Sequence, residues 1–86
     1  MSLEAKFQKA SVDVQGLSQK PSNQDMLELY SLFKAASVGA VQGKRPGALN
    51  MVARAKYDAW SKLGEISKED AMNQYIAKVE SMIEAQ

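Results

Sequence analysis

Aromatic rings and lysines on three predicted helices are the side chains best suited to bind a ligand. Tyr30, Phe33 and Lys34 are three and four residues apart in one helical segment, so their side chains touch on one face. Lys56 lies in a second segment and Tyr75 in a third. Rings stack on a planar base, lysines attract phosphates, and a groove between amphipathic helices accommodates a hydrocarbon chain. A ligand with a base, several phosphates and an acyl tail would use all three.

Lys56 is unusual because it lies on an apolar helical stripe. On a helical wheel it shares one side with five apolar residues, which are Val52, Ala53, Ala59, Trp60 and Leu63. Lysine is rarely fully buried without a partner. One interpretation is a lysine whose stem covers the core while its amine reaches water. The other is a cation at the edge of an apolar groove, placed to bind an anion.

The sequence provides little for catalysis. It contains no histidine and no cysteine, and it has neither a metal-ligand cluster nor a glycine-rich phosphate loop. The adjacent carboxylates of Glu69 and Asp70 lie at a predicted helix start, where they interact favourably with the helix dipole. We therefore predict a binding protein without catalytic residues, metal ligands or a cofactor.

Length and charge limit the remaining classes of protein. The chain of 86 residues suits a single domain over residues 1–86. Its net charge of +1 excludes a generic nucleic-acid or membrane-surface binder. Five basic residues and no acidic residue lie between Leu29 and Tyr57, which indicates a local anion site. With no membrane-spanning run and no targeting signal, a soluble cytoplasmic protein is expected.

Apolar periodicity predicts an all-α fold of four amphipathic helices. The predicted helices span about Leu3–Gly16, Asn23–Val38, Met51–Leu63 and Ser67–Glu84. In the second of these helices Leu29, Leu32 and Ala36 form a core-facing stripe, while Met26, Tyr30, Phe33 and Lys34 form a neighbouring one. The cleanest apolar stripe of the chain lies in the fourth helix.

Caps and turns separate the predicted helices. Ser22, Asn50 and Ser67 are expected to accept hydrogen bonds from the free amides of the helices that follow them. The segment Gly39–Asn50 contains three glycines and a proline, so it is predicted to be a long loop, and loops of this length are often functional. Within it, Pro46 and Gly47 predict a type II turn with the glycine in the left-handed conformation.

Seven short segments of the chain point to a known family. They are Leu29-Tyr30-Ser31-Leu32-Phe33-Lys34, Val38-Gly39, Arg45-Pro46-Gly47, Ala55-Lys56-Tyr57-Asp58-Ala59-Trp60, Ser67-Lys68-Glu69-Asp70-Ala71-Met72, Tyr75-Ile76 and Lys78-Val79-Glu80. In this order and spacing they closely resemble the acyl-CoA-binding protein family over essentially the full chain. The resemblance implies a four-helix up-down-down-up bundle with a long loop between the second and third helices. It also implies non-enzymatic binding, buffering and transport of medium- to long-chain acyl-CoA esters.

The resemblance further implies which residues bind the ligand. Tyr30, Lys34 and Lys56 match residues for the adenine and the ribose 3′-phosphate, and Tyr75 matches a ring near the CoA moiety. Positions that border the acyl chain in the family are matched by Met26 and Leu27. The full predicted set of ligand-binding residues outside this acyl groove is Gln15, Tyr30, Ser31, Leu32, Phe33, Lys34, Val52, Lys56 and Tyr75.

Some of these positions depart from the family pattern. Phe33 stands where the family usually has a tyrosine, so the ring is kept and a hydroxyl is lost. Gln15 and Val52 stand where members often have a basic residue that contacts the ligand. Ala35 replaces a common glutamine, and Ala40 replaces a common aspartate.

Two alternatives to a carrier stay open at this point. A helical protein-interaction module would use the basic middle to dock an acidic partner, with Tyr30, Phe33 and Tyr75 as interface rings. An accessory acyl-CoA-binding domain of a larger lipid enzyme is the other alternative. For a carrier, the expected partners are acyl-CoA esters, with acyl-CoA-using enzymes and membrane surfaces as transient ones. Nucleic acid is not expected, and the chain is expected to be a monomer.

Overall fold

Four α-helices form the fold of this chain in the computed structural model, which describes residues 2–86. They are α1 (Leu3–Asp13), α2 (Asn23–Ser37), α3 (Met51–Lys62) and α4 (Lys68–Ala85), and a 3₁₀ turn, η1 (Val14–Gly16), continues α1. Residues 2–86 contain no strand, so the predicted all-α class is confirmed. None of the helices described is both long enough and apolar enough to cross a bilayer.

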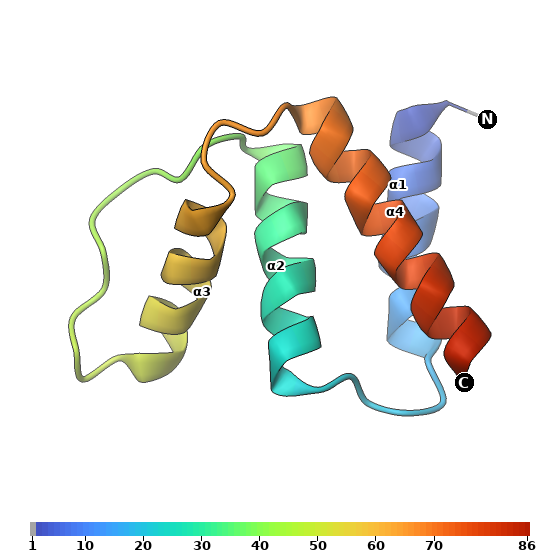
Figure 1. The fold of residues 1–86 in the computed structure, drawn as a ribbon, viewed down its shortest axis with the longest axis horizontal. Helices are drawn as coiled ribbons and strands as arrows, with labels where there is room; N and C mark the ends of the chain where they lie inside the picture. Colours follow the sequence, from blue (N-terminus) through green and yellow to red (C-terminus); the bar gives the residue numbers. More distant parts are fainter. Residues whose placement is uncertain (1) are drawn as a thin grey trace.

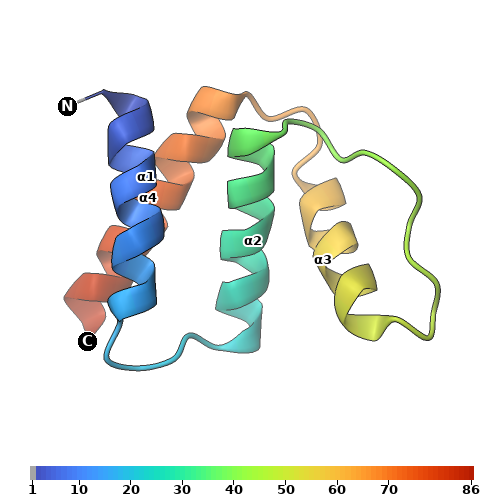
Figure 2. The ribbon, with the colours of Figure 1, turned by 180° about the vertical axis from the view of Figure 1, so that it is seen from behind.

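The order of the helices gives an up-down-down-up bundle. Helices α2 and α3 are neighbours that point in the same direction, whereas α1 and α4 point the opposite way (Figure 1). The main packing contacts join α1 to α4, α4 to α2, and α2 to α3. Seen from behind, α3 stands apart from α1 and α4 on the far side of α2 (Figure 2). The predicted topology is therefore confirmed.

Serine side chains cap the N-termini of three of the four helices. The Ser22 hydroxyl accepts a hydrogen bond from the Asp25 amide at 3.1 Å, and the Ser67 hydroxyl accepts one from the Asp70 amide at 3.0 Å, as predicted. Ser2 caps α1 in the same way. The prediction that Asn50 caps α3 was wrong, because its side chain makes no capping hydrogen bond. Its backbone lies at φ −100° and ψ 71°, outside the extended conformation that the serine caps share.

The loop between α2 and α3 is held in place by side chains of α3. The Trp60 indole donates a hydrogen bond to the Gly39 carbonyl at 2.8 Å, and the Tyr57 hydroxyl donates one to the Gly43 carbonyl at 3.0 Å. Arg45 donates two hydrogen bonds to the Asp58 carboxylate, at 2.8 and 2.7 Å. This bidentate pair lowers the pKa of Asp58 from its ordinary value.

The predicted type II turn at Gly47 was wrong. The glycines with positive φ are Gly39, Gly43 and Gly64, and Gly47 is not among them. The turn lies further along the chain, where the Asn50 amide donates to the Gly47 carbonyl at 3.0 Å. Gly47 is therefore the first residue of that turn, a position that needs no left-handed backbone.

The core lies between α2 and the two helices that pack on it, α3 and α4, and it extends to α1 through Phe7 and Ala10. Its buried residues are Phe7, Ala10, Leu29, Leu32, Ala35, Ala36, Trp60, Ala71, Tyr75 and Val79. The stripe predicted on α2, Leu29, Leu32 and Ala36, is buried as expected. Trp60 is the buried residue that α3 contributes, so the packing of α3 depends strongly on this one ring.

We expect Trp60→Phe to lower the free energy of unfolding by about 1–3 kcal/mol, since the half-buried Gly39 carbonyl loses its donor. The matched control is Tyr57→Phe, which removes an exposed hydrogen bond from the same helix to the same loop and should cost less than about 1 kcal/mol. Urea denaturation followed by far-UV circular dichroism measures both. Equal losses in the two variants would show that the indole hydrogen bond does not anchor α3.

Candidate ligand-binding site

Three aromatic rings from three helices meet beside the core. The Phe7 ring of α1 lies 5.3 Å from the Phe33 ring of α2 and 5.1 Å from the Tyr75 ring of α4, between ring centroids. Phe33 and Tyr75 are 6.0 Å apart, so the three rings form one cluster. Phe7 and Tyr75 are buried and Phe33 is partly exposed. Burial raises the pKa of the Tyr75 hydroxyl above its ordinary value.

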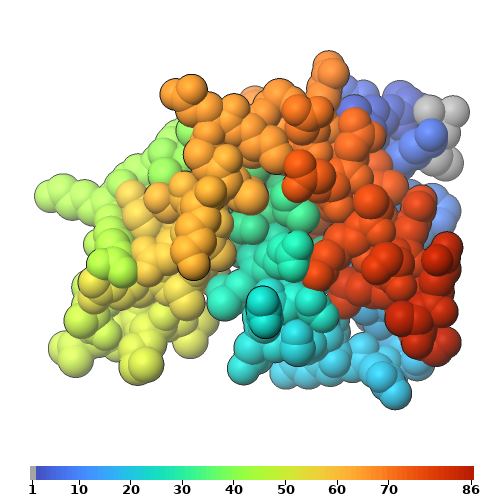
Figure 3. All heavy atoms as spheres, in the orientation of Figure 1, coloured from blue at the N-terminus to red at the C-terminus, as the bar shows by residue number. Residues whose placement is uncertain are grey.

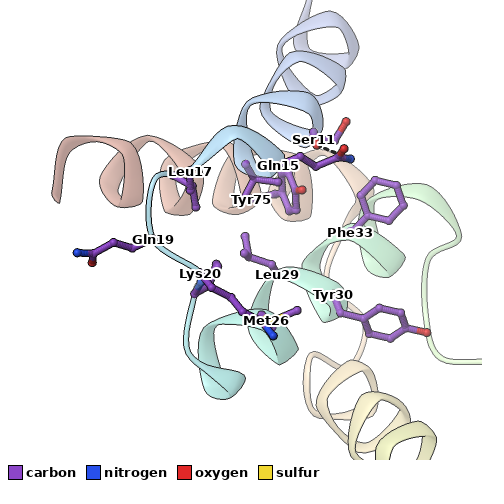
Figure 4. A pocket seen from close by; sticks show the side chains of 12 residues that line it. Ser11, Gln15, Leu17, Gln19, Lys20, Met26, Leu29, Tyr30, Phe33 and Tyr75 are labelled. Atoms are coloured by element: carbon purple, nitrogen blue, oxygen red, sulfur yellow. Dashed lines mark hydrogen bonds between the residues drawn. The ribbon is translucent and has the colours of Figure 1, made fainter. Parts of the chain in front are cut away.

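A cavity of about 740 Å³ opens over this ring cluster between α1, α2 and the linker that joins them (Figure 4). Its lining residues are Ser11, Val14, Gln15, Leu17, Gln19, Lys20, Pro21, Met26, Leu29, Tyr30, Phe33 and Tyr75. Polar groups come from α1 and the linker, and the rings come from α2 and α4. This first cavity is in the size range of small-molecule sites.

A second cavity, of about 480 Å³, lies between α2 and α3. Its walls are mainly apolar and consist of Asn23, Met26, Leu27 and Tyr30 of α2 with Met51, Val52, Ala55 and Lys56 of α3. The surface is notched between these two helices at the lower edge of the molecule (Figure 3). Met26 and Tyr30 line both cavities, so the cavities adjoin along one ridge of α2.

Two lysines near this ridge are placed over aromatic rings. The Lys56 ammonium lies 5.3 Å from the centroid of the Tyr30 ring, and the Lys34 ammonium lies 5.1 Å from that of Trp60. Among residues 2–86 neither lysine forms an ion pair with a carboxylate. Both therefore keep ammonium hydrogens free to donate to an anion.

The nearby carboxylates of α2 are already paired. Lys78 of α4 donates hydrogen bonds to Asp25 at 2.8 Å and to Glu28 at 2.7 Å. These bonds lower the pKa of Asp25 and raise that of Lys78. The pairing joins α4 to α2 and reduces the negative charge beside the cavities, where it would otherwise repel an anionic ligand.

Comparison with known proteins identifies the family. The family model described as "Acyl CoA binding protein" matches residues 4–79 of the chain. The chain belongs to the acyl-CoA-binding protein family. It is 52% identical to the "Acyl-CoA-binding protein homolog" of Manduca sexta over 84 residues, which cover 96% of this chain and 93% of that protein. It is 46% identical to an "Acyl-CoA-binding protein" of Gossypium hirsutum over 85 residues, with 99% and 96% covered.

A solved structure of this family has the same fold. The crystal structure of acyl-CoA-binding protein 2 from Oryza sativa superposes with a TM-score of 0.93 at 40% sequence identity. The superposition covers 98% of this chain and 93% of the rice protein. The arrangement of four helices described above is therefore that of the acyl-CoA-binding protein family.

Most residues for which the acyl-CoA-binding resemblance predicts a ligand contact lie at the two cavities. Gln15, Phe33 and Tyr75 line the first, Leu27, Val52 and Lys56 line the second, and Met26 and Tyr30 line both. Lys34 lines neither cavity and lies over Trp60 instead. Their individual contacts with a ligand stay predictions.

Two other residues of the predicted set lie away from both cavities, and their contacts with a ligand also stay predictions. Ser31 and Leu32 are buried and line neither cavity. The Ser31 hydroxyl donates to the Glu28 carbonyl at 2.8 Å within α2, and Leu32 is part of the core. The cause is helical geometry, because residues one or two positions from Tyr30 turn away from its face.

Sequence reasoning missed the linker. Lys20 lines the first cavity, and so do Leu17, Gln19 and Pro21. The linker is tied to the end of α4, where the Gln86 side-chain oxygen accepts hydrogen bonds from the Ser18 amide and hydroxyl at 2.7 and 2.9 Å. A non-periodic segment gives no pattern from which such contacts could be predicted.

We expect Phe33→Tyr to change the free energy of unfolding by less than about 0.5 kcal/mol, because the partly exposed ring can direct a hydroxyl into the first cavity. The matched change Phe7→Tyr places a hydroxyl in the buried part of the same cluster and should cost about 1–3 kcal/mol. Urea denaturation compares the two. A loss at Phe33 as large as that at Phe7 would contradict the open position of its ring.

Proposed function

We propose that this chain binds medium- to long-chain acyl-CoA esters reversibly and carries them without chemical change. The observation that supports this proposal most directly is the mainly apolar second cavity, which Met26 and Leu27 line together with Tyr30 and the cation Lys56. An acyl-CoA ester has the same two-part character, with a charged nucleotide at one end and a hydrocarbon chain at the other. Membership of the acyl-CoA-binding protein family supports the same ligand.

In this proposal the nucleotide is bound by rings and lysines. The Tyr30 ring stacks on the adenine, and the ammonium groups of Lys34 and Lys56 donate to phosphate oxygens. Support comes from the free donors of both lysines and from the position of Lys56 directly over Tyr30. An anion there would bind beside a ring that is also available for the base.

The acyl chain is proposed to lie along the apolar walls beside Met26 and Leu27. A chain of roughly 15 methylenes, at about 0.8 kcal/mol each, contributes at most about 12 kcal/mol when it is fully buried. Loss of translational and conformational freedom reduces that sum substantially. Tail burial should therefore supply most of the affinity, while the phosphate contacts distinguish CoA esters from other amphiphiles.

The proposal contains no catalytic step. The sequence lacks histidine and cysteine, the usual general base and the usual thiolate nucleophile. The thioester would be released as it was bound, so the biological effect is a change in the free concentration of the ester. Acyl-CoA-using enzymes are the proposed recipients.

We expect Lys56→Met to weaken binding of palmitoyl-CoA by about 1.5–3 kcal/mol, the range for a hydrogen bond to a charged group. Methionine retains an unbranched apolar stem, so the fold should be preserved. Lys62→Met is the matched control, because Lys62 lies in the last turn of the same helix and lines neither cavity. Isothermal titration calorimetry measures each affinity, and equal values for wild type and Lys56→Met would refute the phosphate role.

Ligand dissection tests the proposed function itself. Free CoA retains the polar contacts and loses the tail, whereas palmitate retains the tail and brings a carboxylate that must be desolvated. Each should bind at least about 100-fold more weakly than palmitoyl-CoA, a difference of roughly 2.7 kcal/mol. Calorimetry in one buffer gives all three affinities. Should CoA alone bind as tightly as its long-chain ester, neither cavity is an acyl site and the carrier function fails.

A further inference from the structure

The most exposed large apolar side chains of residues 2–86 lie together at one corner of the molecule. Leu49 is 102% exposed, Met51 is 76% exposed and Val52 is 68% exposed. They lie where the long loop enters α3, at the lower left of Figures 1 and 3. Single exposed apolar residues are ordinary on a protein surface, but three within four positions form a patch. We refer to Leu49, Met51 and Val52 as the apolar corner.

The apolar corner is continuous with the second cavity. Met51 and Val52 line that cavity opposite Met26 and Leu27, while Leu49 lies outside both cavities. A hydrocarbon chain that passes along the corner would therefore reach the cavity over an apolar surface. Leu49 has no such contact with the cavity, so a ligand site alone does not explain its exposure.

The charge around the apolar corner is positive, although the net charge of the chain is only +1. The first turn of α3 contains no acidic residue, and Arg54 and Lys56 follow within the next turn. Asp58, further along α3, is paired with Arg45. At the adjacent end of α2, Asp25 and Glu28 share the single cation Lys78, which leaves one net negative charge there against the two cations of α3. Among residues 2–86 Arg54 and Lys56 have no carboxylate partner, so the charge next to the corner stays positive and complements an anionic surface.

The apolar corner and the cations next to it are complementary to the interface of an anionic bilayer. Such an interface offers acyl chains to the apolar side chains and phosphate or carboxylate groups to the lysines and arginines. The C-terminal end of α4, whose last turn contains Glu84, lies at the far side of the molecule from the apolar corner (Figure 1).

We propose that the apolar corner inserts into the surface of an anionic lipid bilayer, with the second cavity facing the lipid. This inference rests on the proposed function and adds the route by which a long-chain ester moves between bilayer and protein. The ester's tail leaves the bilayer along Met51 and Val52 and enters the cavity without crossing water. Leu49 anchors the corner in the lipid and does not bind the ester.

The experiment measures vesicle binding and ester affinity separately. The wild-type protein should float together with vesicles of phosphatidylcholine and phosphatidylserine. The substitution Leu49→Gln should reduce partitioning to these vesicles roughly tenfold. The matched control is Val12→Gln, which replaces a comparably exposed apolar residue on α1, away from the corner, and should leave partitioning unchanged. Calorimetry with palmitoyl-CoA in the absence of vesicles should give the same affinity for wild type and Leu49→Gln.

Two further measurements test insertion and charge. Leu49→Trp should show a blue-shifted emission on anionic vesicles, over the constant signal of the buried Trp60. Binding should weaken on vesicles of phosphatidylcholine alone and at high salt. Equal partitioning of wild type and Leu49→Gln would overturn the inference. So would self-association that Leu49→Gln abolishes in analytical ultracentrifugation, since the corner would then bind a second copy. Failure of palmitoyl-CoA to bind in calorimetry would instead overturn the proposed function.

Discussion

The parallel arrangement of α2 and α3 is the constraint on which the rest of the structure depends. Two neighbouring helices that point the same way cannot be joined by a short turn, because the chain must first return along the second helix. The 12 residues of α3 rise about 18 Å, so a loop of this span is required. The loop avoids regular structure and is fixed instead by Tyr57, Asp58 and Trp60 of the helix that it precedes.

This connection also accounts for the cavities. Because α3 is attached to the loop and packs mainly on α2, it does not close against α1 or α4. Met26 and Tyr30 of α2 consequently line the first cavity on one side and the second cavity on the other. In a closed four-helix bundle, a neighbouring helix would cover them. The binding surface is thus a consequence of topology, and the individual side chains determine what it binds.

The sequence predicted the parts of the fold that follow a helical period. The buried stripe of Leu29, Leu32 and Ala36 and the serine caps are examples, since each depends on local spacing alone. Asn50 failed as a cap because its backbone conformation is set by the preceding turn, which no local pattern specified.

The site was predictable only in part for a related reason. A family motif of consecutive residues includes core positions such as Leu32 beside cavity-lining ones such as Tyr30, and only the helical phase separates them. Lys20 came from a linker without any period, so its place beside the first cavity could not be derived. The cytoplasmic location and the monomeric state stay predictions, as does the extent of the domain over residues 1–86.

The positions of the acidic residues determine which lysines are paired and which are free to bind an anion. Lys78 lies beside Asp25 and Glu28 and is occupied by two charged hydrogen bonds. Lys34 and Lys56 have rings as neighbours, and a cation–π contact at an exposed site contributes only about 0.5–1 kcal/mol. A charged hydrogen bond contributes about 1.5–3 kcal/mol, so a phosphate can displace the ring as the partner of either ammonium. In the proposed complex, transfer of the Lys56 ammonium from the Tyr30 ring to a phosphate would free the face of that ring for the adenine base. The absence of acidic residues between Leu29 and Tyr57 therefore has two effects. It makes the region positive, and it leaves Lys34 and Lys56 with ring partners weak enough for a phosphate to replace.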